Sequence, residues 1–263
     1  MSEFLYELKR AVKSRNFVIS LIIGIFICFL DILIFRITFK GDSDRILIQA
    51  WIGTNYAFAF NSVFYSLMPV IACLPYGASY FSDMRTGYDK NILTRTSRRK
   101  YMAAKVSVSF FIGFLAVCIP LLIDLFISAG FYPNLTPEKL TFLSAGIIDR
   151  DMFPVLFNSR PLLYILIFTF IDGMFGGLFN IISIAVSKFS GSSFTATVVP
   201  FVLYILTGVL MQNFESINLS ILELVNPVQR YSADIKLICC LYSGILIICL
   251  GIIMKQGRKR DVI

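Results

Sequence analysis

Three aspartates stand inside otherwise apolar stretches of this chain: Asp31, Asp124 and Asp172. A carboxylate at the centre of a bilayer costs about 2.5–3.5 kcal/mol on insertion scales, so such residues usually face a cavity or a polar partner. Together they would suit a cationic or amphipathic substrate, such as a basic peptide. The alternative is a structural charge, with Arg36 as a possible ion-pair partner of Asp31. Asp172 lies deepest and is the best candidate for lining a substrate path.

A second group of charged side chains lies in the segment 83–105, which carries seven basic residues. Gly87 permits a sharp turn of the backbone. Tyr88 and Ile92 give a short apolar stripe, and Ser97 can cap a helix that begins after it. Charge alone would fit a loop that sets topology and binds lipid. The order of turn, short amphipathic helix and cap is more than topology requires.

Several kinds of chemistry are disfavoured by what the sequence lacks. The chain has no His, the commonest general base and metal ligand. Its six Cys all lie in apolar runs, without a C-x-x-C pair, and are interpreted as small buried hydrophobic residues. We therefore predict no catalytic residues and no metal site, and a membrane enzyme is disfavoured.

The composition places the chain in a membrane. Of its 263 residues, 57% are hydrophobic and 15% are charged, whereas soluble domains have about 45–50% and 25%. A soluble core of this size could not bury so many apolar side chains, but a bilayer can. At about 20 residues per span, the length allows six or seven helices. We expect one all-α integral membrane domain, 1–263.

Runs without charged residues predict six transmembrane helices. The run 46–82 is too long for one span, and Trp51 and Asn55 indicate an interfacial lead-in before the second helix. The stretch 190–193 predicts the turn between spans four and five. The predicted spans are 17–35, 56–81, 102–129, 161–188, 194–212 and 236–254.

The distribution of Lys and Arg predicts the orientation of these spans. With both termini in the cytoplasm, the inner segments carry 16 basic residues and the outer segments carry 8. The net charge of +8 then comes from the cytoplasmic face, where anionic lipid accounts for it without nucleic acid. We therefore expect a multi-pass protein of a bacterial plasma membrane.

Three segments lie outside the spans and the loop. Residues 1–16 predict an amphipathic helix on the inner membrane surface, because apolar residues recur on one face. This helix is either a plain topology anchor or a surface for another protein. The outer segment 130–160 contains a helix start at Thr136, and the outer segment 213–235 contains a short, re-entrant helix at 217–225. The apolar face of the first helix consists of Phe4, Leu5, Leu8, Ala11 and Val12.

The segment between spans two and three resembles the cytoplasmic loop of ATP-binding-cassette (ABC) exporter permeases of the type-2 kind. The late Asn226-Pro227 resembles the Asn-Pro turn that such permeases carry before their last span. Six spans with both ends inside match as well, so the resemblance covers the whole chain by layout. Asp83 stands where Glu is usual in the family. The residues that carry the loop pattern are Leu74, Pro75, Tyr76, Asp83, Gly87, Arg95, Ser97, Arg98, Tyr101 and Lys105.

In that family the loop is a coupling helix that docks in a groove of a separate ATPase subunit. The resemblance implies that 83–100 is the coupling loop, that Gly87 makes its turn, and that Arg95 and Arg98 pair with acidic groups of the ATPase. ATP and Mg would be bound by that partner, because this chain has no G-x-x-x-x-G-K-[ST] motif. The residues assigned to this contact are Asp83, Gly87, Tyr88, Ile92, Arg95, Ser97, Arg98 and Lys105.

The predicted function is that of a transmembrane permease subunit of an ABC exporter, without enzymatic activity of its own. Its substrate would be hydrophobic or amphipathic, in the first place a peptide, with a lantibiotic or a drug as alternatives. A second permease subunit, identical or related, would complete the transporter within the lipid. The alternative is an ion-coupled carrier or channel that uses the three aspartates directly, although the two halves show no evident repeat.

Overall fold

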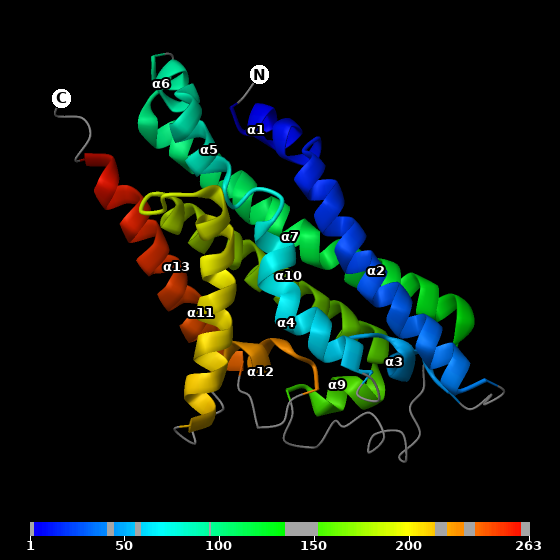
Figure 1. Ribbon diagram of the computed structural model, residues 1–263. Helices are drawn as coiled ribbons and strands as arrows, with labels where there is room; N and C mark the ends of the chain where they lie inside the picture. Colours follow the sequence, from blue (N-terminus) through cyan, green and yellow to red (C-terminus); the bar gives the residue numbers. More distant parts are fainter. Residues whose placement is uncertain are drawn as a thin grey trace.

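The computed structural model of this protein describes residues 3–40, 45–55, 59–94, 96–134, 152–213, 220–228 and 235–258. Within these ranges all regular secondary structure is helical, and no strand occurs. The long helices run side by side, and shorter helices lie at both ends of the bundle (Figure 1). The all-α class predicted from the sequence is confirmed for this part of the chain.

Five helices are long and apolar enough to cross a membrane. Their outward faces expose large apolar side chains, such as Ile22 and Ile247. Apolar faces of this extent suit contact with lipid rather than water. The chain therefore has the character of an integral membrane protein. The five helices are α2 (Arg15–Thr38), α7 (Arg98–Phe131), α10 (Pro161–Ser187), α11 (Ser193–Asn213) and α13 (Ile235–Arg258).

The predicted second span, 56–81, is not one continuous helix. The helix α4 (Ala59–Cys73) has 15 residues, a turn follows, and α5 (Ser79–Thr86) then begins. Pro75 lies in this turn and has no N–H to donate to the carbonyl four residues earlier. That carbonyl, of Ile71, instead accepts a hydrogen bond from the Ser20 hydroxyl at 2.6 Å. Since α4 is shorter than the roughly 20 residues of a span, a sixth crossing stays a prediction.

The centre of the bundle is the seam between α7 and α10, which pack closely through glycines. A Cβ on Gly113 would lie 2.6 Å from the carbonyl oxygen of Gly176. A Cβ on Gly173 would lie 2.3 Å from the Cys118 sulfur. The G-x-x-x-G of α10, formed by Gly173 and Gly177, therefore brings two helices of the same chain together.

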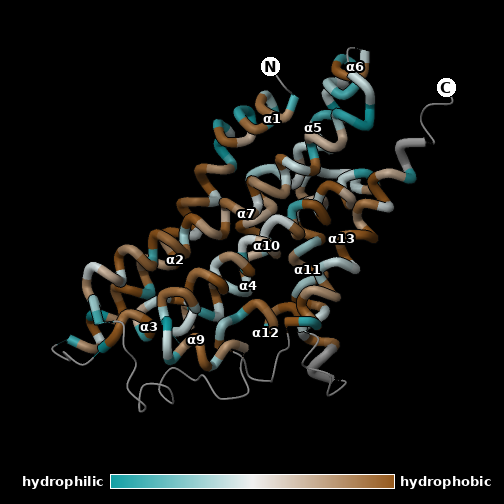
Figure 2. Tube along the Cα trace, turned by 180° about the vertical axis from the view of Figure 1, so that it is seen from behind, coloured by the Kyte–Doolittle hydropathy of each residue, from teal (hydrophilic) through white to brown (hydrophobic). Residues whose placement is uncertain are grey.

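The short helices gather at two opposite ends of the bundle (Figure 1). The α6 end holds α1 (Glu3–Val12), α5, α6 (Tyr88–Leu93) and the last turns of α13. The α12 end holds α3 (Leu47–Ala50), α9 (Pro154–Ser159) and α12 (Ile221–Val225). Figure 2 shows hydrophilic residues concentrated in α1, α5 and α6, whereas the long helices are mostly hydrophobic.

Other predicted boundaries differ from the structure by a few residues. The predicted helix 1–16 ends at Val12, and the Ser14 hydroxyl caps α2 by accepting from the backbone N–H of Phe17 at 3.1 Å. The third span begins at Arg98 rather than at 102. Ser97 stands at its N-cap position, but its side chain makes no capping hydrogen bond. The predictions for Arg95, for Thr136 and for parts of the two outer segments fall outside the described residues.

Candidate functional site

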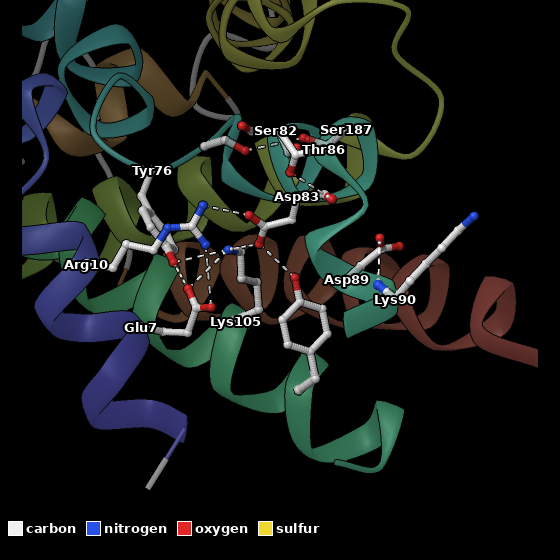
Figure 3. Close-up of polar contacts among 12 residues, drawn as sticks. Glu7, Arg10, Tyr76, Ser82, Asp83, Thr86, Asp89, Lys90, Lys105 and Ser187 are labelled. Carbon is white, nitrogen blue, oxygen red and sulfur yellow. Dashed lines mark hydrogen bonds and ion pairs between the residues drawn. The ribbon is translucent and has the colours of Figure 1, made fainter. Parts of the chain in front are cut away.

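Four charged side chains and two tyrosines form a buried group at the α6 end, which we call the ion cluster (Figure 3). Asp83 and Lys105 are fully buried, and Glu7 is nearly so. Burying charges in this way is tolerated only when they pair well and their remaining hydrogen-bonding capacity is satisfied. The cluster contains Glu7 and Arg10 from α1, Tyr76 from the turn after α4, Asp83 from α5, and Tyr101 and Lys105 from α7.

Asp83 lies at the centre of the ion cluster. Its Oδ2 accepts hydrogen bonds from Lys105 Nζ at 2.6 Å and from the Tyr101 hydroxyl at 2.8 Å. Its Oδ1 accepts from Arg10 Nη2 at 2.7 Å. Charge-assisted bonds on both oxygens stabilise the ionised carboxylate away from solvent. Asp83 thereby ties α5 to both α1 and α7.

Lys105 has an acceptor for each of its three ammonium protons. Besides Asp83, these are Glu7 Oε2 at 3.2 Å and the Tyr76 oxygen at 3.1 Å. The Tyr76 hydroxyl in turn donates to Glu7 Oε2. An ammonium group has three donors and no acceptor, so its hydrogen bonding is complete. This explains how a fully buried lysine is accommodated in α7.

Arg10 closes the ion cluster toward the surface, with its side chain 37% exposed. Partial burial alone would lower the pKa of its guanidinium, but the hydrogen bond and the charge of Asp83 outweigh burial and raise that pKa above the usual value. The guanidinium also lies 4.8 Å from the centre of the Tyr88 ring, within the range of a cation–π contact. Arg10 therefore joins α1 to α5 and to the first residue of α6.

The turn between α5 and α6 depends on Gly87, whose φ of +71° is left-handed. Such a conformation is easy for glycine and strained for most other residues. No residue of α6 is buried. Ile92 packs its side chain against a core group that includes Tyr80 and Tyr101, while Leu93 is exposed. Helix α6 is thus anchored on one side and presented to its surroundings on the other.

Tyr88 marks where α1 and α6 meet. Burial raises the pKa of the Tyr88 hydroxyl, and a hydrogen bond with Tyr6 raises it further. A second contact lies at the N-terminal end of α1. There the hydroxyl of Thr96, just before α7, donates a hydrogen bond to the Glu3 carboxylate. Helix α1 therefore contacts the segment 83–105 on both sides of α6, at Tyr88 and at Thr96.

The structure places seven of the eight predicted loop residues, and they fall into three groups. Asp83 and Lys105 meet in the ion cluster, although 22 positions separate them in the chain. Gly87, Tyr88 and Ile92 form the turn and the helix below it. Ser97 and Arg98 lie at the start of α7, and Arg95 is outside the described residues.

The prediction missed Glu7 and Arg10 of the ion cluster, and it included Tyr76 and Tyr101 in the loop pattern without assigning them to the site. A usable signal existed on two helices, because Glu7 and Arg10 are three residues apart and Tyr101 and Lys105 four apart, which places each pair on one helical face. Nothing in the sequence says which partners those faces meet. Helix α1 turns Glu7 and Ala11 inward; of its predicted apolar face, it exposes Phe4, Leu5 and Val12.

The three span aspartates lie outside the ion cluster. All three are fully buried within the chain. In each, Oδ2 accepts one hydrogen bond, whereas Oδ1 makes none with any residue that the structure describes. The donors are Asn55 Nδ2 to Asp31 at 2.8 Å, the Ile52 backbone N–H to Asp124 at 2.8 Å, and the Tyr65 hydroxyl to Asp172 at 3.0 Å.

Arg36 does not pair with Asp31 as the sequence suggested. Its guanidinium lies 3.9 Å from the centre of the Phe131 ring, and Asp31 faces Asn55 instead. Five residues along a helix amount to about 500° of rotation, so side chains at this spacing point in clearly different directions. Arg36 is at the exposed surface, while Asp31 points into the bundle.

A metal centre finds no support in the part of the chain that the structure describes, where no three His, Cys, Asp or Glu side chains gather in a suitable group. Comparisons with known proteins gave no matching family model, curated protein or solved structure. The function is therefore inferred from the residues and the geometry of this chain.

Proposed function

We propose that this chain is the transmembrane permease subunit of an ATP-driven ABC exporter of the type-2 kind. The observation that carries the proposal is the exposed helix α6, which directly follows α5. Asp83 of α5 is bound through the ion cluster to α1 and α7. A separate ATPase subunit would dock against α6. The resemblance of segment 83–105 to the coupling loop of such permeases supports the same assignment.

The ion cluster suits α6 to transmit a movement. Asp83 on α5 is held by Lys105 of α7 and by Arg10 of α1. Separating these side chains would leave charges buried and unpaired, at a cost of about 3–5 kcal/mol. A displacement of α6 by a closing ATPase would therefore carry α5, α1 and the span α7 along together.

The remaining features of the proposal follow from the exporter assignment. The ATPase partner binds ATP and Mg, and a second permease subunit, identical or related, completes the transporter. The α6 end and both chain termini face the cytoplasm of a bacterial cell. The substrate is hydrophobic or amphipathic, with a peptide as first choice, because short outer segments leave little apparatus for recognising polar sugars.

Co-purification from the native host tests the proposal directly. A tagged chain is extracted in mild detergent, and the proteins that accompany it are identified. The variant Lys90→Glu with Leu93→Asp changes exposed residues of α6 and leaves the ion cluster intact. The control Lys255→Glu repeats the lysine-to-glutamate change at an exposed position in the last turns of α13, which lie at the α6 end. We expect a stoichiometric ATPase with the wild type and the control, and its loss with the α6 variant.

A stable assembly without any ATPase would refute the exporter assignment. It would favour the alternative of an ion-coupled carrier, which the unbonded carboxylate oxygens of Asp31, Asp124 and Asp172 support. Retention of the ATPase by the α6 variant would leave the exporter standing and place the docking surface elsewhere.

A further inference from the structure

The segment Ile46–Asn55 is buried throughout, although most of it is not helical. All ten of its residues are buried, and only the single turn α3, Leu47–Ala50, is helical. It lies at the α12 end and contacts α7 and α10. Irregular backbone at membrane depth is tolerated only where protein surrounds it or it lines a water-filled cavity. We call it the plug segment.

The backbone of the plug segment is held by side chains from several helices. Asp124 of α7 accepts from the Ile52 N–H at 2.8 Å. Asn61 of α4 donates to the carbonyls of Ile52 and Gly53 at 2.8 and 2.9 Å. Asn226, directly after α12, donates to Asn61 Oδ1 at 2.9 Å. The plug segment is therefore bound directly by α4 and α7, and the residues after α12 are linked to it only through Asn61.

Asp31 adds α2 to this set by accepting from Asn55 Nδ2 at 2.8 Å. Asp31 and Asp124 each accept a hydrogen bond from the plug segment, and the other oxygen of each carboxylate makes none with the described residues. Carboxylates inside a membrane are costly and normally serve a specific contact. Here that contact is with the plug segment, which lies at the α12 end of the bundle.

We propose that the plug segment is the outer gate of the transport path, and that Asp31 and Asp124 are positioning residues that hold it closed. The role as a gate rests on the proposed exporter function, which places the α12 end outside the cell. Helix α7 carries Lys105 in the ion cluster and Asp124 at the plug segment. A displacement of α7 that begins at α6 would therefore draw Asp124 away from Ile52 and free the segment.

Thiol labelling of a residue in the plug segment tests, in the absence of ATP, whether Asp31 and Asp124 hold this segment in place. Ile52→Cys is introduced into a chain whose two exposed cysteines, Cys239 and Cys240, are replaced by alanine. A membrane-impermeant maleimide should label this chain slowly from outside. Adding Asp124→Leu, which removes the acceptor for the Ile52 N–H, should raise the labelling rate at least about tenfold. The same chain without Ile52→Cys gives the background.

Two further variants separate a specific hold from general loosening. Asp124→Asn keeps an acceptor oxygen and should retain slow labelling. Asp172→Leu removes a carboxylate that is equally buried but bonds to Tyr65 rather than to the plug segment, and it should also label slowly. If Asp124→Leu fails to fold, Asn55→Leu carries the same prediction, because it removes the bond to Asp31 without altering a span.

Equal labelling of folded Asp124→Leu and its parent chain would overturn the proposal, as would equally fast labelling of Asp172→Leu. In the assembly with its ATPase, ATP should raise the labelling rate of Ile52→Cys. An active ATPase without that rise would refute the gate and leave the exporter assignment intact. Failure to recover any ATPase would refute the exporter assignment, while the measurements without ATP would still decide whether the aspartates hold the segment.

Discussion

Lys105 illustrates at the scale of one residue how this chain buries charge. Its three donors and three acceptors match. We predict that Lys105→Met lowers the free energy of unfolding by about 3–5 kcal/mol, because Glu7 and Asp83 would then share a single cation, Arg10. Chemical unfolding of the purified chain in detergent measures this loss.

Two comparisons make the Lys105 prediction specific. Lys100→Met removes an exposed lysine one turn earlier in α7 and should change stability by less than about 0.5 kcal/mol. Adding Glu7→Gln to Lys105→Met restores the balance of one anion and one cation and should recover part of the loss. An additive double variant would mean that charge balance is not what the cluster requires.

Gly87 is a second position where one residue decides local geometry. A Cβ at this position would meet no atom within 4 Å, so any cost of substitution comes from its positive φ. We predict that Gly87→Ala destabilises the protein by about 1–2 kcal/mol and that Gly87→Asn costs less, since Asn tolerates the left-handed region. Gly191→Ala, also in open space but without a positive φ, should be neutral in the same unfolding assay.

At the scale of elements, α1 is held by the ion cluster and by Ala11 and Leu8, which pack into an apolar cluster with residues of α2 and α7. Glu7 and Arg10 point toward α5 and α7, and apolar Leu5 and Val12 point outward. An outward apolar face on a helix next to a span fits the boundary of lipid headgroups and acyl chains. Helix α1 is therefore attached to the protein by the ion cluster and by this apolar contact, and its outward apolar face suits contact with the membrane.

The attachment of α1 can be tested by limited proteolysis. Arg10→Glu would place a third carboxylate beside Glu7 and Asp83 and should release α1. We expect trypsin then to cleave after Lys13 or Arg15 at least about fivefold faster, because a detached helix exposes the connection to α2. Lys9→Glu, an exposed change on the same helix, should leave the rate unaltered. Equal protection of both variants would contradict the role given to Arg10.

The α7–α10 seam makes a prediction for a pair of elements. Gly113→Ala would place a methyl group 2.6 Å from the backbone of α10, and backbone cannot rotate away as a side chain can. We expect a loss of about 1–3 kcal/mol. Gly244→Ala in α13, where a Cβ meets nothing within 4 Å, should be neutral or slightly stabilising. Similar melting behaviour of the two variants would argue against a close seam.

At the scale of the whole molecule, the proposed orientation places α6 inside and α9 outside the cell. In a chain without Cys239 and Cys240, we predict that Val155→Cys in α9 reacts with an impermeant maleimide in intact cells. Asn91→Cys in α6 should react only after the cells are permeabilised. Both positions are exposed in the structure. Reaction of Asn91→Cys in intact cells would reverse the orientation and refute docking of a cytoplasmic ATPase.

Structural features that depend only on residues near one another in the chain could be predicted from the sequence. Long apolar runs predicted the membrane class and the places of the five long helices, since a span needs only composition and length. Gly87 predicted the turn before α6. These signals are local, so they can be recognised without knowing which segments meet.

Which residues far apart in the sequence form hydrogen bonds and ion pairs with each other is seen only in the folded chain. Glu7 and Lys105 are 98 positions apart, and Asp124 and Ile52 are 72 apart. The same pattern of charges fits an inner loop, a lipid-facing surface or a buried cluster, because hydropathy fixes where a side chain stands along the membrane normal but not the helix it faces. Packing of α1, α5 and α7 turned Asp83 into the centre of the ion cluster. Packing of α2, α4 and α7 placed Asp31 and Asp124 within hydrogen-bond distance of the plug segment.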